Sequence, residues 1–392
     1  MTSEASRLSE IFMAFLRLGC MAFGGPVAHL SYFRDAFVTR RKWLSESEYL
    51  ELIALCQTAP GPSSSQLGFA IGWSRGGPAG ALAAWLGFTL PSALLMIAAA
   101  YGVFFISSET IETKLLGGLL VAAAAVVAKA VLGMARSLGP DSITWGIVLF
   151  GAFAAMISPG SLTQVAVIFT GAGIASMFRE TPGSSCGADF STMPRLVSLR
   201  TAFLLMVVFL SLLAVSLLLP FGTPAALIAK HYQAGALVFG GGHVVLPLLH
   251  ESIVATGMLD EAHFFAGYGA AQTLPGPLFT LAAFTGTVGG GGWATGIASL
   301  VAIFLPGLLL VAILLPVWVR YRSNRWIKRG LRGANGAVVG LLAAALIGPV
   351  SSNAIQGWAD LALASAAFVA LQIFKVPALL VVVATGLIGI AL

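Results

Sequence analysis

Long apolar runs constrain this chain more than any other feature of its sequence. Seven of them approach the roughly 20 residues that a helix needs to cross a bilayer. They are residues 78–105, 116–136, 201–219, 293–319, 333–350, 355–373 and 376–392. Only 9% of the 392 residues are Asp, Glu, Lys or Arg, against about 25% in soluble domains. We therefore predict an all-α polytopic membrane protein, because a backbone in lipid must satisfy its own hydrogen bonds.

This composition excludes a soluble enzyme, a disordered scaffold and a secreted disulfide framework. The net charge of +6 suits loops held on the cytoplasmic side and does not require a nucleic acid partner. Cys20, Cys56 and Cys186 are far apart, with no CxxC spacing, so we expect no metal site, redox pair or cofactor. The first apolar run carries Arg17 and does not resemble a cleaved signal peptide.

Other apolar segments are short or interrupted. Residues 143–157 and 161–178 are separated by Ser158-Pro159-Gly160, which indicates a tight hairpin of two helices. Glycine and proline interrupt four more segments. These are 10–31, 47–75, 231–249 and 264–290. The polar stretch 179–200 is interpreted as a linker.

The linker separates two copies of one pattern. AFGGPVAHL at 22–30 corresponds to VFGGGHVVL at 238–246, and QTAPGP at 57–62 corresponds to QTLPGP at 272–277. When the copies are aligned without gaps on the second motif, positions 43–91 match 258–306 at 14 of 49 places. Chance similarity between apolar segments produces matches of Leu and Ala, not a shared QTxPGP. The chain is therefore an internal duplication.

Charge predicts opposite orientations for the two copies. Residues 34–42 hold four Lys or Arg side chains, whereas their counterpart 250–263 holds no Lys or Arg, and the bias is reversed between 320–332 and 105–117. By the positive-inside rule the copies are inverted, which is typical of transporters. If the interrupted segments are re-entrant hairpins, each copy crosses four times and the extra helix 201–219 inverts the second. We assign 1–178 to the first repeat, 179–219 to linker and inverting helix, and 220–392 to the second repeat.

The interrupted segments are the candidate substrate site. Residues 47–58 and 62–75 are each too short to span, and Pro60-Gly61-Pro62 must break the helix between them. A helix that starts at such a break presents unpaired N–H groups and a positive dipole end, so it can bind an anion. Donors follow in the first copy, and a second half-site is expected in the other. The residues are Gln57, Thr58, Ser63, Ser64, Ser65 and Gln66, then Gln272, Thr273, Pro275, Gly276, Pro277 and Thr280.

The glycine-rich segments are expected to contribute as well, because they allow close approach of a ligand to the backbone. They contain Phe23, Gly24, Gly25, Pro26 and His29, then Gly240, Gly241, Gly242 and His243. Arg17, Arg75 and Lys129 are candidates to attract an anion electrostatically. Each feature also has a structural interpretation: the breaks as packing kinks, the histidines as satisfied helix ends, and Lys129 as a snorkelling side chain.

These residues resemble the chromate transporter (CHR) family in its long two-domain form. The resemblance rests on AFGGPVAH at 22–29, RRKWL at 40–44, ELIALCQTAPGPSSSQL at 51–67 and the Leu-Pro at 90–91. VFGGGHVVLPLL at 238–249 and QTLPGP at 272–277 look like the second copy. The second copy departs from the first by having Gly242 in place of Pro26 and Leu281 in place of Gln66. The first copy is therefore expected to supply most polar contacts.

The resemblance implies proton-driven export of chromate across a bacterial plasma (inner) membrane by a multi-pass protein, giving chromate resistance. Its site would comprise the FGGP residues, His29, Gln57, Pro60-Gly61-Pro62, Gln66 and their second-copy counterparts. The expected partners are chromate, protons and membrane lipid, with no nucleic acid. The residues leave open sulfate or another oxyanion as substrate, an inward flux, a channel, a membrane-embedded reductase, and assembly as a homodimer.

Overall fold

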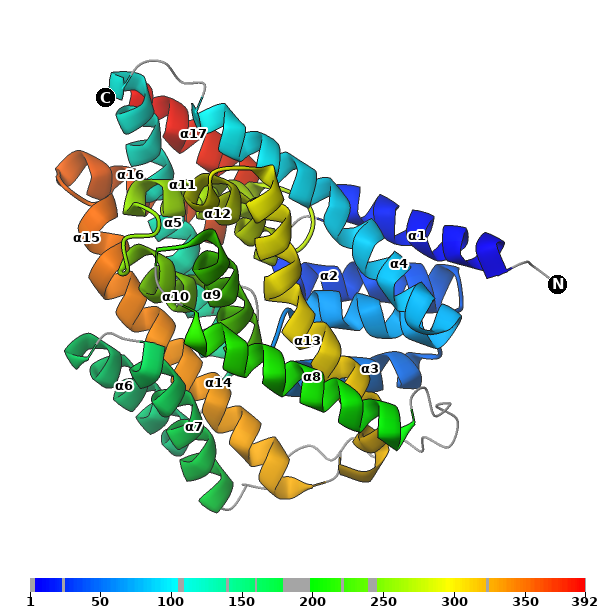
Figure 1. The fold of residues 1–392 in the computed structure, drawn as a ribbon. Helices are drawn as coiled ribbons and strands as arrows, with labels where there is room; N and C mark the ends of the chain where they lie inside the picture. The colour runs from blue at the N-terminus through cyan, green and yellow to red at the C-terminus, as the bar shows by residue number, and fades with distance from the viewer. Residues whose placement is uncertain are drawn as a thin grey trace.

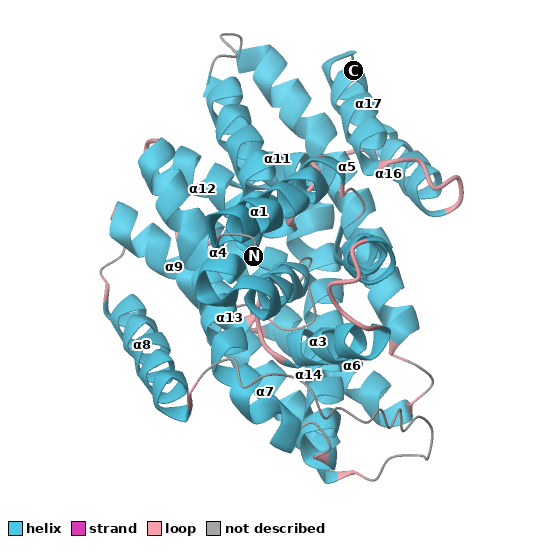
Figure 2. Cartoon of the chain, turned by 90° about the vertical axis from the view of Figure 1, so that its right-hand side faces the viewer, coloured by secondary structure: helices cyan, strands magenta, loops and turns pink. Residues whose placement is uncertain are grey.

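In a computed structural model, the structure describes residues 4–22, 25–104, 109–138, 141–158, 161–178, 198–219, 222–238, 245–321 and 324–391. These residues form helices joined by short loops and contain no strand (Figure 2). Within them, four helical stretches are long and apolar enough to cross a membrane. They are Ser63–Gly102, Gly117–Arg136, Leu199–Leu218 and Trp293–Pro316. The prediction of an all-helical membrane protein is consistent with this architecture.

The helices before the linker follow the segments expected from the sequence. They are α1 (Glu4–Met21), α2 (Gly25–Phe33), η1 (Arg34–Arg40), α3 (Glu46–Thr58), α4 (Ser63–Phe104), α5 (Glu109–Ser137), α6 (Ser142–Ile157) and α7 (Ser161–Met177). The helix α8 (Leu199–Leu218) comes next. It lies on the outside of the bundle in Figure 2, where it packs against the neighbouring helices α9 and α13.

The helices after α8 repeat the same order. They are α9 (Pro224–Leu237), α10 (Val245–Leu249), η3 (His250–Val254), α11 (Glu261–Thr273), η4 (Leu278–Thr280), α12 (Leu281–Gly290), α13 (Trp293–Tyr321), α14 (Arg325–Ala345), η5 (Leu346–Val350), α15 (Ser351–Ala354), α16 (Trp358–Gln372) and α17 (Ala378–Ala391). When the copies are aligned on QTxPGP, α3 coincides with α11 at both ends. A π-helix precedes each of them, η1 before α3 and η3 before α11. The N-cap residue is Ser45 in α3 and Asp260 in α11.

Glycine pairs end both half-helices at equivalent places. The half-helix predicted over 62–75 starts at Ser63 and leaves helical geometry at Gly76 and Gly77, where Gly77 has φ 62°. In the other copy α12 ends at Gly290, its C-cap residue Gly291 has φ 77°, and Gly292 follows. Positive φ is strained for residues with a side chain, so glycine is required for these bends. The long helices resume after them as the second part of α4 and as α13.

The two copies exchange their outer helices. α14 of the second copy packs against α6 and α7 of the first, and α5 of the first packs against α16 and α17 of the second. In Figure 1 the orange α14 accordingly runs beside the green α6 and α7, and the red α17 lies beside the teal α5. A Cβ on Gly333 would lie 2.1 Å from the Gly171 carbonyl oxygen, and one on Gly118 would lie 2.2 Å from that of Thr385. Glycine thus permits backbone contact at equivalent crossings.

The inner helices form the rest of the core. α1 packs on α4, and the equivalent α9 packs on α13, while α4 also contacts α11, α12 and α13. One buried apolar cluster runs through both copies. The end of α13 meets α3, where the Trp318 indole N–H donates to Glu51 Oε1 at 3.0 Å. The predicted linker 179–200 lies largely outside the described residues.

Candidate functional site

The first Pro-Gly-Pro break joins α3 to α4 and is held mainly by the second copy. Gly61 has φ 125°, and its N–H donates to the carbonyl oxygen of Val238, at the end of α9, at 2.7 Å. A Cβ on Gly61 would lie 2.8 Å from the Cα of Gly307. The Gln66 amide Nε2 donates to the carbonyl oxygens of Pro60 at 2.8 Å and Gly307 at 3.1 Å. One side chain therefore binds the break to α13.

The second break, between α11 and α12, is built in the same way from the first copy. Gly276 has φ 105°, and its N–H donates to the carbonyl oxygen of Ala22, at the end of α1, at 3.0 Å. A Cβ on Gly276 would lie 2.6 Å from the hydroxyl oxygen of Ser92. Ser92 is the equivalent of Gly307 in the alignment of the two copies. Each break is thus completed by the opposite copy.

The polar groups beside the two breaks differ. In the first copy Ser64, Ser65 and Gln66 are buried in the first turn of α4, where backbone N–H groups lack intrahelical acceptors. The Ser65 hydroxyl and Gln66 Oε1 have no hydrogen-bond partner among the described residues. In the second copy the Thr280 hydroxyl donates to the Pro277 carbonyl oxygen at 2.9 Å, and Leu281 replaces Gln66. The first break therefore retains more hydrogen-bonding capacity for a ligand.

His29 lies at the second break, although its motif belongs to the first copy. The side chain is fully buried, and Nε2 donates to the Ala22 carbonyl oxygen at 3.1 Å, the same oxygen that accepts from Gly276. Its ring meets Phe88 edge to face at 5.1 Å between centroids. Its Nδ1 has no partner within the described part of the chain. His29 therefore reinforces the crossing and leaves one ring nitrogen available.

The remaining predicted residues are distributed around these breaks. Gly25 and Pro26 lie in the first turn of α2, and Gln57 and Thr58 in the last turn of α3. The Thr273 hydroxyl donates to the Ala270 carbonyl oxygen at 2.7 Å. Some candidates lie outside the described residues. They are Phe23, Gly24, Gly240, Gly241, Gly242 and His243.

The three proposed cations are exposed in the structure. Arg17 lies on α1 and Lys129 on α5. Arg75 Nη2 lies 3.8 Å from Glu10 Oε2, and its guanidinium stacks over the Trp43 ring at 5.4 Å from the centroid. These contacts engage Arg75 at the end of the first half-helix. The described contacts do not bring these cations to either break.

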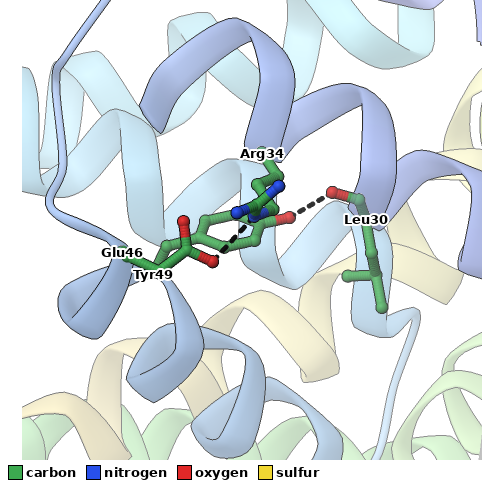
Figure 3. Close-up of polar contacts among 4 residues, drawn as sticks. All are labelled: Leu30, Arg34, Glu46 and Tyr49. Carbon is green, nitrogen blue, oxygen red and sulfur yellow. Dashed lines mark hydrogen bonds and ion pairs between the residues drawn. The ribbon is translucent and has the colours of Figure 1, made fainter. Parts of the chain in front are cut away.

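The helix that ends at the first break starts at an ion pair. Arg34 Nε donates to Glu46 Oε1 at 2.7 Å, and the Tyr49 hydroxyl donates to the Leu30 carbonyl oxygen (Figure 3). The hydrogen bond that Arg34 donates to Glu46 raises the pKa of its guanidinium above the ordinary value. Arg34 therefore remains charged at physiological pH, although both side chains of the pair are about half exposed to solvent.

Sequence reasoning missed the acceptors that hold the breaks. Val238 and Ala22 act through backbone carbonyls, and Gly307 and Ser92 through close contact. The shared Leu-Pro at 90–91 and 305–306 directly precedes Ser92 and Gly307, so the repeat did mark their location. Which copy each would contact was not encoded in that signal.

Comparison with known proteins identifies the family. The family model described as chromate transporter matches residues 9–177 and again residues 225–390, together well over half of the chain. The chain belongs to the chromate transporter family. Family membership supports a role in chromate transport.

Named relatives match along most of their length. A probable chromate transport protein of Synechococcus elongatus is 28% identical over 88% of this chain and 84% of its own. Chromate transport proteins of Pseudomonas aeruginosa and Cupriavidus metallidurans are also 28% identical, over 86% and 88% of this chain and 80% and 83% of theirs. No solved structure matches the chain.

Proposed function

We propose that this protein exports chromate from the cytoplasm across the bacterial plasma membrane, driven by the proton motive force, and thereby confers chromate resistance. The observation that carries the proposal is the buried first turn of α4, where the Ser65 hydroxyl lacks a partner among described residues. The homologous chromate transport proteins support chromate as the substrate.

The chemistry of this turn suits a tetrahedral oxyanion. Unpaired N–H groups and the positive end of the helix dipole favour negative charge, and the hydroxyl of Ser65 can donate another hydrogen bond. Removal from bulk water strengthens these interactions. Gln66 Oε1 is an acceptor, so it suits a bound water or a proton on the anion. Chromate would therefore bind at the start of α4, beside the Pro-Gly-Pro break.

The crossed hydrogen bonds suggest how the site would be exposed alternately. Because Gly61 bonds Val238 and Gly276 bonds Ala22, a displacement of one copy against the other changes both breaks together. Rocking of repeats about a midplane site is a common transport mechanism. We infer that the contact between Trp318 and Glu51, near basic segments 320–332 and 34–42, keeps both segments on the cytoplasmic face.

Accumulation of chromate in energised everted membrane vesicles tests the proposal, because uptake into such vesicles corresponds to export from the cell. Vesicles with this protein should take up chromate faster than vesicles without it, and a protonophore should abolish the difference. Sulfate in excess should inhibit only weakly. Uptake that is unchanged by the protonophore would contradict proton coupling. Transport of sulfate at the same rate as chromate would contradict the assigned substrate.

Paired proline variants locate the site. Pro60→Leu should abolish uptake, because the side chain lies in the break and the geometry at Gly61 depends on it. Pro316→Leu, within α13 and away from the breaks, is the matched control and should retain transport. Equal transport by both variants in membranes of equal protein content would remove the break from the site.

A further inference from the structure

The second copy has a histidine–carboxylate pair where the first copy has an arginine–carboxylate pair. His250 begins η3, and its Nε2 lies 2.9 Å from Oε1 of Glu261, the first residue of α11. This pair is the counterpart of Arg34 and Glu46, which occupy the starts of η1 and α3. Glu261 matches Glu46 in the alignment of the two copies. The basic partner has therefore changed from a guanidinium to an imidazole.

The environment of His250 is partly enclosed. Its side chain is 15% exposed and that of Glu261 is 31% exposed. The rings of Phe264 and Phe265 lie with centroids 5.6 Å from its own. His250 and Glu251 line a partly open cavity of about 230 Å³ to which α6, α14 and η5 also contribute lining residues. The pair is thus partly exposed, and its His250 borders a pocket lined by residues of both copies.

Few other charges surround this pair among the residues that the structure describes. η3 itself carries Glu251, and α11 carries the pair formed by His263 and its N-cap Asp260. From α9 comes Lys230, which donates to Gln233 Oε1 at 3.3 Å. The described residues of α10, and those of α6, α14 and η5 that line the cavity, carry no charged side chain. Apart from Lys230, these charged groups beside His250 are therefore carboxylates and one histidine–carboxylate pair.

We propose that His250 and Glu261 bind the proton whose movement drives chromate export, an inference that rests on the proposed function above. Imidazole changes its charge between about pH 5 and 8, whereas guanidinium does not. With a proton on both ring nitrogens, His250 forms a charged pair with Glu261, and loss of one proton leaves the carboxylate without a cation. The charge bias of the loops predicts that this loop lies on the outer face, where the driving proton would enter.

α11 connects the proton site to the substrate site. It is a helix of 13 residues, from Glu261 to Thr273, and the second Pro-Gly-Pro break follows directly. Gly276 in that break bonds Ala22 across the copies. A helix transmits a displacement at its start to its end, about 20 Å away. Formation or loss of the contact between His250 and Glu261 would therefore displace the hydrogen bond between Gly276 and Ala22. That hydrogen bond must rearrange when one copy moves against the other.

The test separates driven transport from exchange in reconstituted vesicles. A gradient of about one pH unit, acidic on the side of His250, should drive about tenfold accumulation per coupled proton in the unaltered protein. His250→Gln retains an N–H donor towards Glu261 but does not titrate, and His250→Arg restores the first copy's arginine–carboxylate pair. Both should lose the pH-driven accumulation and retain chromate exchange between preloaded vesicles and medium.

A matched control is His263→Gln, because His263 also contacts a carboxylate, with Nδ1 at 2.5 Å from Asp260 Oδ2, but does not line the cavity. It should keep the driven accumulation. If either His250 variant keeps it undiminished, the proposal is wrong. If the unaltered protein exchanges chromate but ignores the pH gradient, proton coupling itself fails. If the His250 variants do not fold, Glu261→Gln provides the same comparison. It should lose the pH-driven accumulation. Retention of that accumulation would contradict the proposed role of the pair.

Discussion

The two Pro-Gly-Pro breaks share a backbone and differ in what surrounds it. Gly61 and Gly276 both have positive φ, and each donates its N–H to the end of the other copy's first helix. Around the first break, Gln66 bonds two carbonyl oxygens, and Ser65 has no partner among described residues. Around the second, Thr280 bonds Pro277 internally.

This difference indicates that both copies retain the backbone geometry of the Pro-Gly-Pro break, whereas the side chains beside it have diverged. The backbone geometry must be kept in both copies because the breaks hold the copies together. The donors need to be kept only where a substrate binds. We therefore interpret the first break as the binding element and the second as the element that responds to the proton pair at the start of α11.

The glycines should show the largest effects. Gly61→Ala places a Cβ in a strained region and 2.8 Å from backbone of Gly307, which cannot move easily. It should destabilise by about 3 kcal/mol and abolish transport. In Gly276→Ala the new Cβ meets the Ser92 hydroxyl, which belongs to a side chain that can rotate. This variant should lose about 1 kcal/mol less free energy of unfolding than Gly61→Ala. Thermal unfolding in detergent measures both, and adding Ser92→Gly should partly rescue only Gly276→Ala.

Exchange of the residues after the breaks should have the next largest effect. Gln66→Leu copies the second break into the first and leaves the Pro60 and Gly307 carbonyls without this donor. We expect a loss on the order of 2 kcal/mol in the free energy of unfolding, with transport strongly reduced. Leu281→Gln, the reverse change, should produce no gain in transport and buries an amide in an apolar position. Normal transport by Gln66→Leu would show that this amide is dispensable.

The hydroxyls should separate binding from stability. Ser65→Ala removes a group without a partner among described residues, so the unfolding free energy should hardly change. The KM for chromate should rise about tenfold, as expected for one lost hydrogen bond to an anion. Thr280→Ala loses its bond to Pro277 and should lower stability by about 1 kcal/mol without altering KM. An unchanged KM for Ser65→Ala would show that chromate does not bind at this turn.

The ion pair of the first copy should show the smallest effect. Arg34 is a guanidinium and stays charged at physiological pH, and the hydrogen bond that it donates to Glu46 raises its pKa further, so this pair does not titrate through Arg34. Arg34→Gln should therefore leave the pH profile of chromate transport unchanged, unlike His250→Gln. Transport rates measured from about pH 5.5 to 8 in vesicles compare the two. A matching shift for both variants would mean that the copies respond to pH in the same way.

The helices and breaks were predictable because proline and glycine act locally. Pro60-Gly61-Pro62 breaks a helix wherever it occurs, and the glycines at 76–77 and 291–292 end both half-helices as their equivalence suggests. The expected preference for the first copy also follows from Gln66 and the serines. Opposite orientation of the copies, by contrast, remains a prediction from charge.

The sequence could not assign contacts between the copies. Nothing in QTxPGP states that Gly61 bonds Val238 and not Ala22, because both acceptors are backbone carbonyls that every residue has. Arg75 was a candidate for anion attraction, yet it contacts Glu10 and Trp43. The long reach of a charged side chain leaves its partner undetermined until the surrounding helices are placed.

The sequence by itself determined a duplicated, helical membrane protein with two backbone breaks, because apolar length, proline and glycine act over a few residues. Only the tertiary structure decided that each break is completed by the opposite copy, that the outer helices are exchanged, and that His250 meets Glu261 beside a cavity. Those relations depend on packing between segments distant in sequence, where shape and backbone hydrogen bonds select the partner and local residue preferences carry no information.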